Sequence, residues 1–333
     1  MSGDKAGLTT SILRSVSRSF YLSIRILPGR LREPVAVAYL LARSSDTVAD
    51  TAKIEKKIRV ETLAKLSSII RGDQARDTIA DQVAAFAPLQ TNLSERKLME
   101  LLPETLQRFE QLNDDDRADV RELLNTITQG QMMDLKSFDN PPNVRALASP
   151  ADLDRYTYLV AGCVGEFWTR LGFRHVRNFA TMSESKMLEL GRHYGMGLQL
   201  VNILRDAGSD LRAGRCYFPE QELAAVRMSP TDILREPERF QTIYRKWIDK
   251  AQRGLESGVQ YSNAIRHRRV RAASALPALI GARTIALLRN AGVTALHREI
   301  KVPRNEVRSI ISSLVMKFAS RKQIESMFNN PKV

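Results

Sequence analysis

The chain has 333 residues, 43% of them hydrophobic, which is enough for one large core or two modest ones. Its 17 glycines and 13 prolines are too few for a loop-rich β architecture, and two cysteines with four histidines argue against a disulfide framework or a zinc or iron–sulfur site. The net charge of +14 indicates an anionic partner: nucleic acid, an anionic membrane surface or a phosphorylated substrate.

Helical periodicity runs through most of the chain. Apolar residues recur at i, i+3, i+4 and i+7 in long proline-free stretches, namely 35–87, 104–140, 151–218, 238–276 and 278–302. Strand-like alternation is hardly present, and the polar breaks near 139–150 and 226–239 are too short for domain linkers. We therefore predict an all-α fold of about a dozen helices in a single domain, 1–333. Ser94, Asp152 and Ser183 are the expected N-caps.

The distribution of apolar and basic residues bears on partners and location. No apolar run approaches 18 residues and the N-terminus lacks the apolar stretch of a secretory signal, so we expect neither a membrane span nor export, and a cytoplasmic location. Nucleic acid is not an expected partner, because the basic residues are spread along the chain and aromatic residues are 6%. The one dense basic run, RHRRVR (266–271), is either a phosphate-binding strip or a solvated helix face, and the solvated face is favoured.

Aspartate pairs with the spacing Asp-x-x-x-Asp occur five times, at 46/50, 73/77, 77/81, 115/119 and 206/210. The middle three lie in charge-rich segments and are expected to be solvated helix surface. The outer two differ, because each follows a largely apolar run and has an arginine close by: VAVAYLLARSSDTVAD contains Arg43, and YGMGLQLVNILRDAGSD contains Arg205.

Two carboxylates four residues apart share one face of a helix, with Cβ atoms about 5–6 Å apart. They repel by roughly 3 kcal/mol at an effective dielectric near 20, so an apolar helix needs a compensating cation beside them. Arginine supplies it in a structural salt-bridge network. Magnesium supplies it in a diphosphate-binding site, where substrate oxygens complete the coordination and arginines bind phosphate. Spacing alone leaves both interpretations open.

Three blocks resemble a known family. SRSFYLSIRILP…VAVAYLLARSSDTVAD, YTYLVAGCVGEFW and QLVNILRDAGSDLRAGRCYFP are similar, in order and spacing, to blocks of the squalene/phytoene synthases, over about residues 15 to 315. The resemblance implies the isoprenoid-synthase fold, one helical domain around a central apolar cavity. It also implies that two prenyl diphosphates bind there with Mg²⁺ on both aspartate pairs, and that allylic cation formation, attack by the second double bond and proton loss yield a cyclopropane. The glycines at 162, 165, 195 and 197 fit either close helix packing or the wall of such a cavity.

Site residues follow from the same resemblance. The catalytic residues it implies are Asp46, Asp50, Asp206, Asp210 and Tyr156, with Tyr156 assisting proton removal. The metal ligands it implies are Asp46, Asp50, Asn202, Asp206 and Asp210. The substrate-binding residues it implies are Ser19, Phe20, Tyr39, Arg43, Gln199, Asn202, Arg205 and Arg215.

The product is a finer expectation. DTVAD, SRSF and the late stretch ALPALIGARTIALLRNAG resemble squalene synthases more than plant-type phytoene synthases, which implies reduction of presqualene diphosphate to squalene with NADPH. Ala273 and Ser274 depart from the Phe-Cys of the eukaryotic enzymes, and the C-terminus FNNPKV lacks their membrane anchor. We therefore expect a bacterial squalene synthase, and a one-step presqualene diphosphate, dehydrosqualene or phytoene synthase is the alternative.

A third interpretation comes from another class of protein. A non-catalytic basic helical protein that binds membranes or nucleic acid would give the outer aspartate pairs no special role. The enzyme interpretation leaves room for peripheral contact with anionic lipid at the inner membrane face. The sequence leaves the oligomeric state open.

Overall fold

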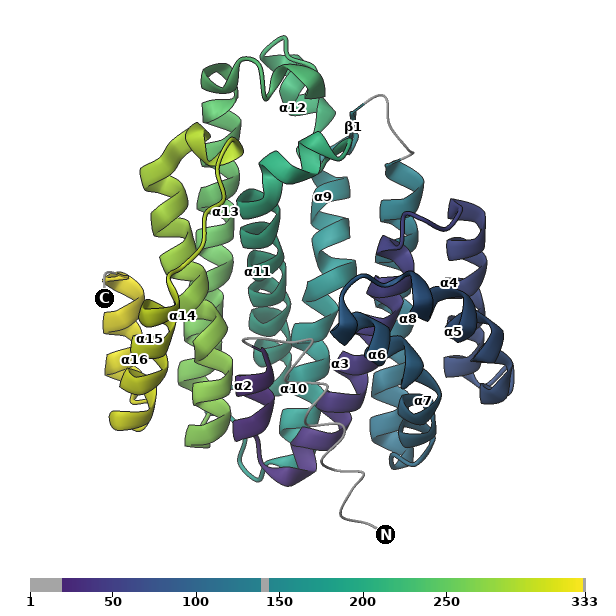
Figure 1. The fold of residues 1–333 in the computed structure, drawn as a ribbon. Coiled ribbons are helices and arrows are strands. Elements are labelled where there is room, and N and C mark those ends of the chain that lie inside the picture. The colour runs from purple at the N-terminus through teal and green to yellow at the C-terminus, as the bar shows by residue number, and fades with distance from the viewer. Residues whose placement is uncertain (1–19, 139–143, 332–333) are drawn as a thin grey trace. The chain divides into compact units, whose positions relative to one another are not determined.

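The computed structural model describes residues 20–138 and 144–331, except for the side chains of Phe20 and Leu22. The chain divides into two compact units, Met1–Leu135 and Lys136–Val333. Helices make up most of the described residues of both units, which confirms the all-α prediction (Figure 1). The prediction of a single domain over 1–333 stays a prediction.

The first unit consists of helices joined by short turns. In order they are α2 (Phe20–Ile26), α3 (Gly29–Asp50), α4 (Lys56–Arg71), the 3-10 turn η1 (Arg76–Ile79), α5 (Ala80–Phe86), the 3-10 turn η2 (Ala87–Leu89), α6 (Leu93–Glu100), α7 (Leu102–Glu110) and α8 (Asp114–Ser137), whose last two residues belong to the second unit. Helix α3 packs against α4, α6 and α7. Its apolar face is buried, with Leu41 fully inaccessible, and this packing holds the end of α3 in place.

The second unit contains longer helices. In order its elements are β1 (Arg145–Ala146), α9 (Pro150–Thr157), one π-helical turn η3 (Tyr158–Gly162), α10 (Cys163–His175), α11 (Glu184–Arg212), β2 (Arg215–Cys216), α12 (Glu220–Ala225), the 3-10 turn η4 (Pro230–Asp232), α13 (Pro237–Ala264), α14 (Arg268–Ala291), the 3-10 turn η5 (Gly292–Leu296), α15 (Arg304–Met316) and α16 (Arg321–Asn329). The two short strands pair in parallel. Helix α11 packs against α10, α13 and α14, which run beside it in Figure 1.

Glycines let these helices touch. A Cβ at Gly165 would lie 1.9 Å from the Gly191 carbonyl oxygen, and one at Gly195 would lie 2.1 Å from the Ala161 oxygen. A Cβ at Gly197 would lie 2.7 Å from the Gly254 Cα. These glycines are therefore needed for close helix packing, one of the two roles that the sequence left open.

The expected helix starts were right to within a few residues. Ser183 is the N-cap of α11 and accepts from the Lys186 N–H at 3.4 Å, as predicted. The cap of α9 is Ser149, not Asp152, because Asp152 completes a capping box from the third helical position. Similarly, Asn92 caps α6 by accepting from the Ser94 N–H.

Two late helices share one proline-free stretch. The stretch 238–276 contains most of α13 and the start of α14, because the chain turns between Ala264 and Arg268. Pro277, which separates two of the proline-free stretches, lies inside α14, where a proline supplies no N–H to the preceding turn. The Tyr194 hydroxyl donates to the Ser274 carbonyl of that turn at 2.8 Å.

The basic run 266–271 is only partly solvated. Arg266 to Arg269 are exposed, but Arg271 is 8% exposed and donates to the carbonyls of Ile265, Arg266 and Ala319. The solvated-face interpretation is therefore wrong for Arg271, which ties α14 to the turn before α16.

One segment within the described ranges is long and apolar enough to cross a membrane, Arg268–Leu296, with a mean hydropathy of 1.3. No unbroken apolar run marks it in the sequence, because isolated arginines interrupt it. Of this window, 67% is buried inside the structure, as for a core helix of a folded protein.

Candidate functional site

The first aspartate pair lies in the last two turns of α3, where the helix leaves its apolar packing. Asp46 is one turn after Arg43, and a guanidinium nitrogen of Arg43 lies 3.9 Å from its carboxylate. The other guanidinium nitrogen binds Glu95 of α6 at 2.5 Å. Arg43 therefore bridges two carboxylates, and no motif in the sequence indicated Glu95 as a neighbour of this pair.

Helix α8 contributes to the same site. The Gln131 side-chain amide donates to Asp46 at 2.6 Å and to the Ser45 hydroxyl at 2.9 Å. Desolvation raises the pKa of Asp46 to about 6, although 44% of the side chain is exposed; the Gln131 hydrogen bond opposes the rise, and Asp50 and Asp134 add to it. The repulsion expected between Asp46 and Asp50 is thus present, and Arg43 only partly offsets it.

A buried arginine lies close to the second carboxylate of this pair. Arg59 of α4 is 7% exposed and donates to the Ala49 carbonyl at 2.7 Å. Burial lowers the pKa of Arg59, and Asp50 raises it. Its Nε has no hydrogen-bond partner among the described residues. Asp50 therefore faces a cation from a different helix, which no motif in the sequence indicated.

The second aspartate pair lies near the end of α11. Arg205 binds Asp206 with two nearly parallel hydrogen bonds, at 2.8 and 2.6 Å. Arg215 binds Asp210 at 2.8 Å. Gly214, with a φ of +84°, turns the chain out of α11 so that β2 returns Arg215 to the helix end. Each carboxylate thus has its own arginine, and the role of both arginines in binding substrate stays a prediction.

The two arginines of the second aspartate pair, Arg205 and Arg215, are partly exposed. The hydrogen bonds to Asp206 raise the pKa of Arg205. The Arg205 and Arg215 side chains are 35% and 36% exposed.

One turn earlier on α11, the side-chain amide of Asn202 donates a weak hydrogen bond to the side-chain oxygen of Gln199 at 3.4 Å. The structure therefore places Gln199 and Asn202 together, on the same side of α11 as the aspartates.

Tyr156 lies among aromatic rings. It is 8% exposed and stacks on Tyr217, with ring centroids 5.0 Å apart, and Tyr217 meets Phe138 edge-on at 5.0 Å. Directly after α9 the chain forms the π-helical turn η3, a feature common at functional sites. Tyr217 follows Arg215 by two residues in RCYFP, yet nothing in the sequence pattern indicated that it would meet Tyr156.

The remaining predicted residues have mixed outcomes. Tyr39 is half-buried, one turn before Arg43 on α3. Ser19 lies outside the described residues, as does the side chain of Phe20. Of the three aspartate pairs expected at the surface, Asp73 and Asp77 are exposed. Asp119 is only 8% exposed, so the surface interpretation is wrong for it: α8 turns that side chain inward.

The residues fit a magnesium ion that takes only part of its coordination from protein. Across residues 20–138 and 144–331, no three His, Cys, Asp or Glu side chains converge closely enough to hold a metal unaided. Magnesium commonly takes one or two carboxylates, with water and substrate phosphates completing its shell. The raised pKa of Asp46 marks a carboxylate that a nearby divalent cation would stabilise in its charged form.

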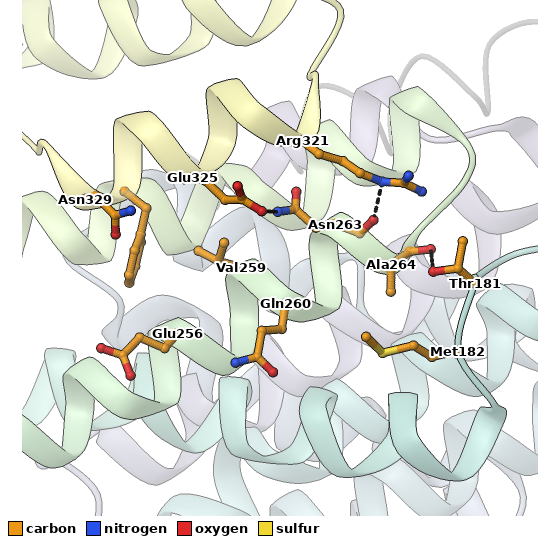
Figure 2. A pocket seen from close by; sticks show the side chains of 11 residues that line it. Thr181, Met182, Glu256, Val259, Gln260, Asn263, Ala264, Arg321, Glu325 and Asn329 are labelled. Atoms are coloured by element: carbon orange, nitrogen blue, oxygen red, sulfur yellow. Dashed lines mark hydrogen bonds between the residues drawn. The ribbon is translucent and has the colours of Figure 1, made fainter.

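Two cavities of the second unit lie away from the predicted residues. One, of about 490 Å³, is lined by residues of α13, α16 and the loop before α11, including Glu256, Gln260 and Glu325 (Figure 2). The other, of about 210 Å³, lies between α11 and α13. No predicted site residue lines either cavity.

Comparisons with known proteins agree with the resemblance in the sequence. The profile of the family described as squalene/phytoene synthase matches residues 13–306. A bifunctional lycopene cyclase/phytoene synthase of Colletotrichum graminicola is 31% identical over 68% of this chain and 36% of its own length. Squalene synthase BSS of Botryococcus braunii is 28% identical over 65% of this chain and 43% of its own. The chain thus spans about two fifths of the length of these curated relatives.

The fold is also found among solved structures. The complex of TcSQS with the ligand BPH1237 aligns with a TM-score of 0.80 at 20% identity, covering 98% of this chain and 90% of the other. This likeness confirms the predicted isoprenoid-synthase fold.

Proposed function

Because this chain belongs to the squalene/phytoene synthase family, we propose that it joins two farnesyl diphosphates head to head, in a magnesium-dependent condensation to presqualene diphosphate. The observation that carries the proposal is that both units contain an aspartate pair near the end of a helix, with arginines bound to its carboxylates. A structural salt-bridge network does not require the same arrangement twice, whereas two diphosphates do.

Asp46 and Asp50 would hold magnesium in one unit, and Asp206, Asp210 and Asn202 in the other. Bound there, magnesium supplies positive charge to diphosphate oxygens. Arg43, Arg205 and Arg215 would release their carboxylates in part and bind the diphosphate oxygens directly, since guanidinium groups match phosphate geometry. This exchange of partners stabilises the leaving diphosphate as the allylic C–O bond breaks.

Tyr156 would serve the later step, proton loss that closes the cyclopropane. Aromatic faces attract positive charge, so the Tyr156 and Tyr217 rings would favour a carbocation on their outer faces. Tyr156 is only 8% exposed, and this burial would limit the water that could quench the cation. The Tyr156 hydroxyl would then assist removal of the proton.

A further part of the proposal concerns which final product the enzyme forms. We propose that presqualene diphosphate is reduced to squalene with NADPH, on the similarity of DTVAD and SRSF to squalene synthases. Phytoene formation from geranylgeranyl diphosphate is the second candidate, favoured by the 31% identity to a phytoene synthase relative. Ala273 and Ser274, both buried in α14, are where this chain departs from the eukaryotic squalene synthases.

Product extraction tests the reaction and distinguishes the candidates. The protein is incubated with farnesyl diphosphate and Mg²⁺, with and without NADPH, and separately with geranylgeranyl diphosphate. Squalene formed only with NADPH supports the proposal. Presqualene diphosphate in both incubations indicates a one-step enzyme, and turnover of geranylgeranyl diphosphate alone indicates a phytoene synthase.

Variants test the aspartate pairs themselves. Asp46→Asn and Asp206→Asn should each lower turnover by about 10²–10³, because each removes a charge that supports the leaving diphosphate. Asp77→Asn is the matched control, since its side chain is 92% exposed. Equal activity in all three variants would contradict the enzyme proposal and favour a non-catalytic basic protein.

We also propose a cytoplasmic location with peripheral contact to anionic membrane, supported by the net charge of +14. If the protein co-sediments equally with vesicles that contain anionic lipid and with vesicles that lack it, the proposed contact with anionic membrane is wrong.

A further inference from the structure

The cavity between α11 and α13 is lined by basic and apolar residues that have no role in the proposed reaction. Its volume is about 210 Å³, and it is lined by His193, Met196, Gly197, Leu200, Lys250, Arg253, Gly254 and Ser257. Three of these side chains are basic and none is acidic. His193 and Arg253 are exposed and Lys250 is partly exposed, so the cavity offers positive charge at its rim, where an anion from solution can reach it.

The cavity lies on a different face of α11 from the aspartate pair. His193, Met196, Gly197 and Leu200 recur at the spacing of one helical stripe. Asn202, Asp206 and Asp210 form another stripe, about 130° away at 100° per residue. A ligand in the cavity is therefore separated from the second aspartate pair by the body of the helix.

Two of the basic groups have contrasting settings. Lys250 is held in place by Asp154 at 2.7 Å and lies 4.8 Å from the centre of the Trp247 ring. The Arg253 guanidinium is exposed and has no hydrogen bond or ion pair with any residue of the described ranges. Arg253 is thus available to a ligand, whereas the charge of Lys250 is largely neutralised by Asp154.

The base of the cavity is apolar because α11 and α13 cross in close contact there. A Cβ at Gly254 would lie 2.5 Å from the Gly197 Cα, so α11 and α13 touch through backbone at this point. Without side chains at these two positions, the space beside them is bounded by Met196 and the buried Leu200. The cavity combines a cationic rim with an apolar base.

We propose that this cavity binds a phosphate-bearing ligand, with the phosphate on Arg253 and His193 and any apolar part against Met196 and Leu200. A volume of about 210 Å³ admits a phosphate or diphosphate group with a short apolar portion but not a whole prenyl chain. The phosphate can come from a soluble compound or from a lipid headgroup that lies over the cavity.

The test compares Arg253→Gln with Arg245→Gln, an exposed arginine of the same helix that does not line the cavity. In the first arm, inorganic diphosphate is titrated by calorimetry in EDTA, so that magnesium does not recruit it to the aspartate pairs. In the second arm, co-sedimentation is measured with phosphatidylcholine vesicles with and without phosphatidylglycerol. Near-ultraviolet circular dichroism checks that both variants are folded.

Loss of one charged hydrogen-bonding partner should weaken binding roughly tenfold in Arg253→Gln and leave Arg245→Gln unchanged. If Arg253→Gln binds inorganic diphosphate more weakly than Arg245→Gln does, the ligand of the cavity is a soluble phosphate compound. If the two variants differ only in binding to phosphatidylglycerol vesicles, the ligand is a lipid headgroup. Equal losses in both variants, or no binding by the unmodified protein in either arm, would overturn the proposal. Neither arm depends on turnover, so the aspartate variants test the proposed reaction separately.

Discussion

Replacing Gly208 by alanine should destabilise the second unit, although alanine is the better helix former. Gly208 lies in α11 between Asp206 and Asp210, with its Cα turned toward η5. An added Cβ would lie 1.9 Å from the Leu296 carbonyl oxygen, whereas ordinary contact begins at 3.4 Å. The Leu296 backbone must therefore move by about 1.5 Å, the difference between these two distances.

The magnitude follows from two opposing contributions. Alanine gains about 1 kcal/mol over glycine in helix propensity. Overpacking a rigid contact costs about 1–3 kcal/mol, and here the obstacle is backbone that cannot change rotamer. The movement also disturbs the hydrogen bond from Arg212 to the Leu296 carbonyl, at 3.1 Å. We expect a net loss of about 1–2 kcal/mol in the free energy of unfolding.

Urea and thermal unfolding followed by circular dichroism measure this loss. The control is Gly29→Ala at the start of α3, where an added Cβ meets nothing within 4 Å, so its stability should be unchanged or slightly higher. If Gly208→Ala unfolds at the same urea concentration as Gly29→Ala, or at a higher one, the steric reasoning is refuted.

The pair between Arg283 of α14 and Glu306 of α15 predicts a pH dependence. The hydrogen bond from Arg283 lowers the pKa of Glu306, so the pair stabilises the fold above pH 4.5 and its contribution is lost as the pH falls below that value. Glu306→Gln should cost about 1 kcal/mol at pH 7, and the difference in Tm from the unmodified protein should shrink toward pH 3; a constant difference would contradict the assignment. Tyr156→Phe should retain the stack on Tyr217 and the Tm but lower turnover by about 10²-fold or more, and full activity would exclude a role for its hydroxyl.

The helices and the two aspartate pairs were predictable because their signals are local. Periodic apolar residues require a helix to bury one face, and this requirement alone gave the all-α class. The apolar approach and the nearby arginine separated 46/50 and 206/210 from the other three pairs. The Asp119 error shows the limit of the same reasoning: a charged segment around a residue does not reveal which way a helix turns it.

The sequence by itself thus determined which residues carry charge at the candidate site, because residue types and their helical spacing depend only on positions a few residues apart in the chain. Only the tertiary structure decided what those charges meet. Gln131 reaches Asp46 across 85 positions of the chain, and Arg59 lies near Asp50 because α4 packs on α3. The raised pKa of Asp46 and the cation-lined cavity beside Gly197 likewise depend on helices packing together, since burial and electrostatic fields depend on distance in space rather than distance along the chain.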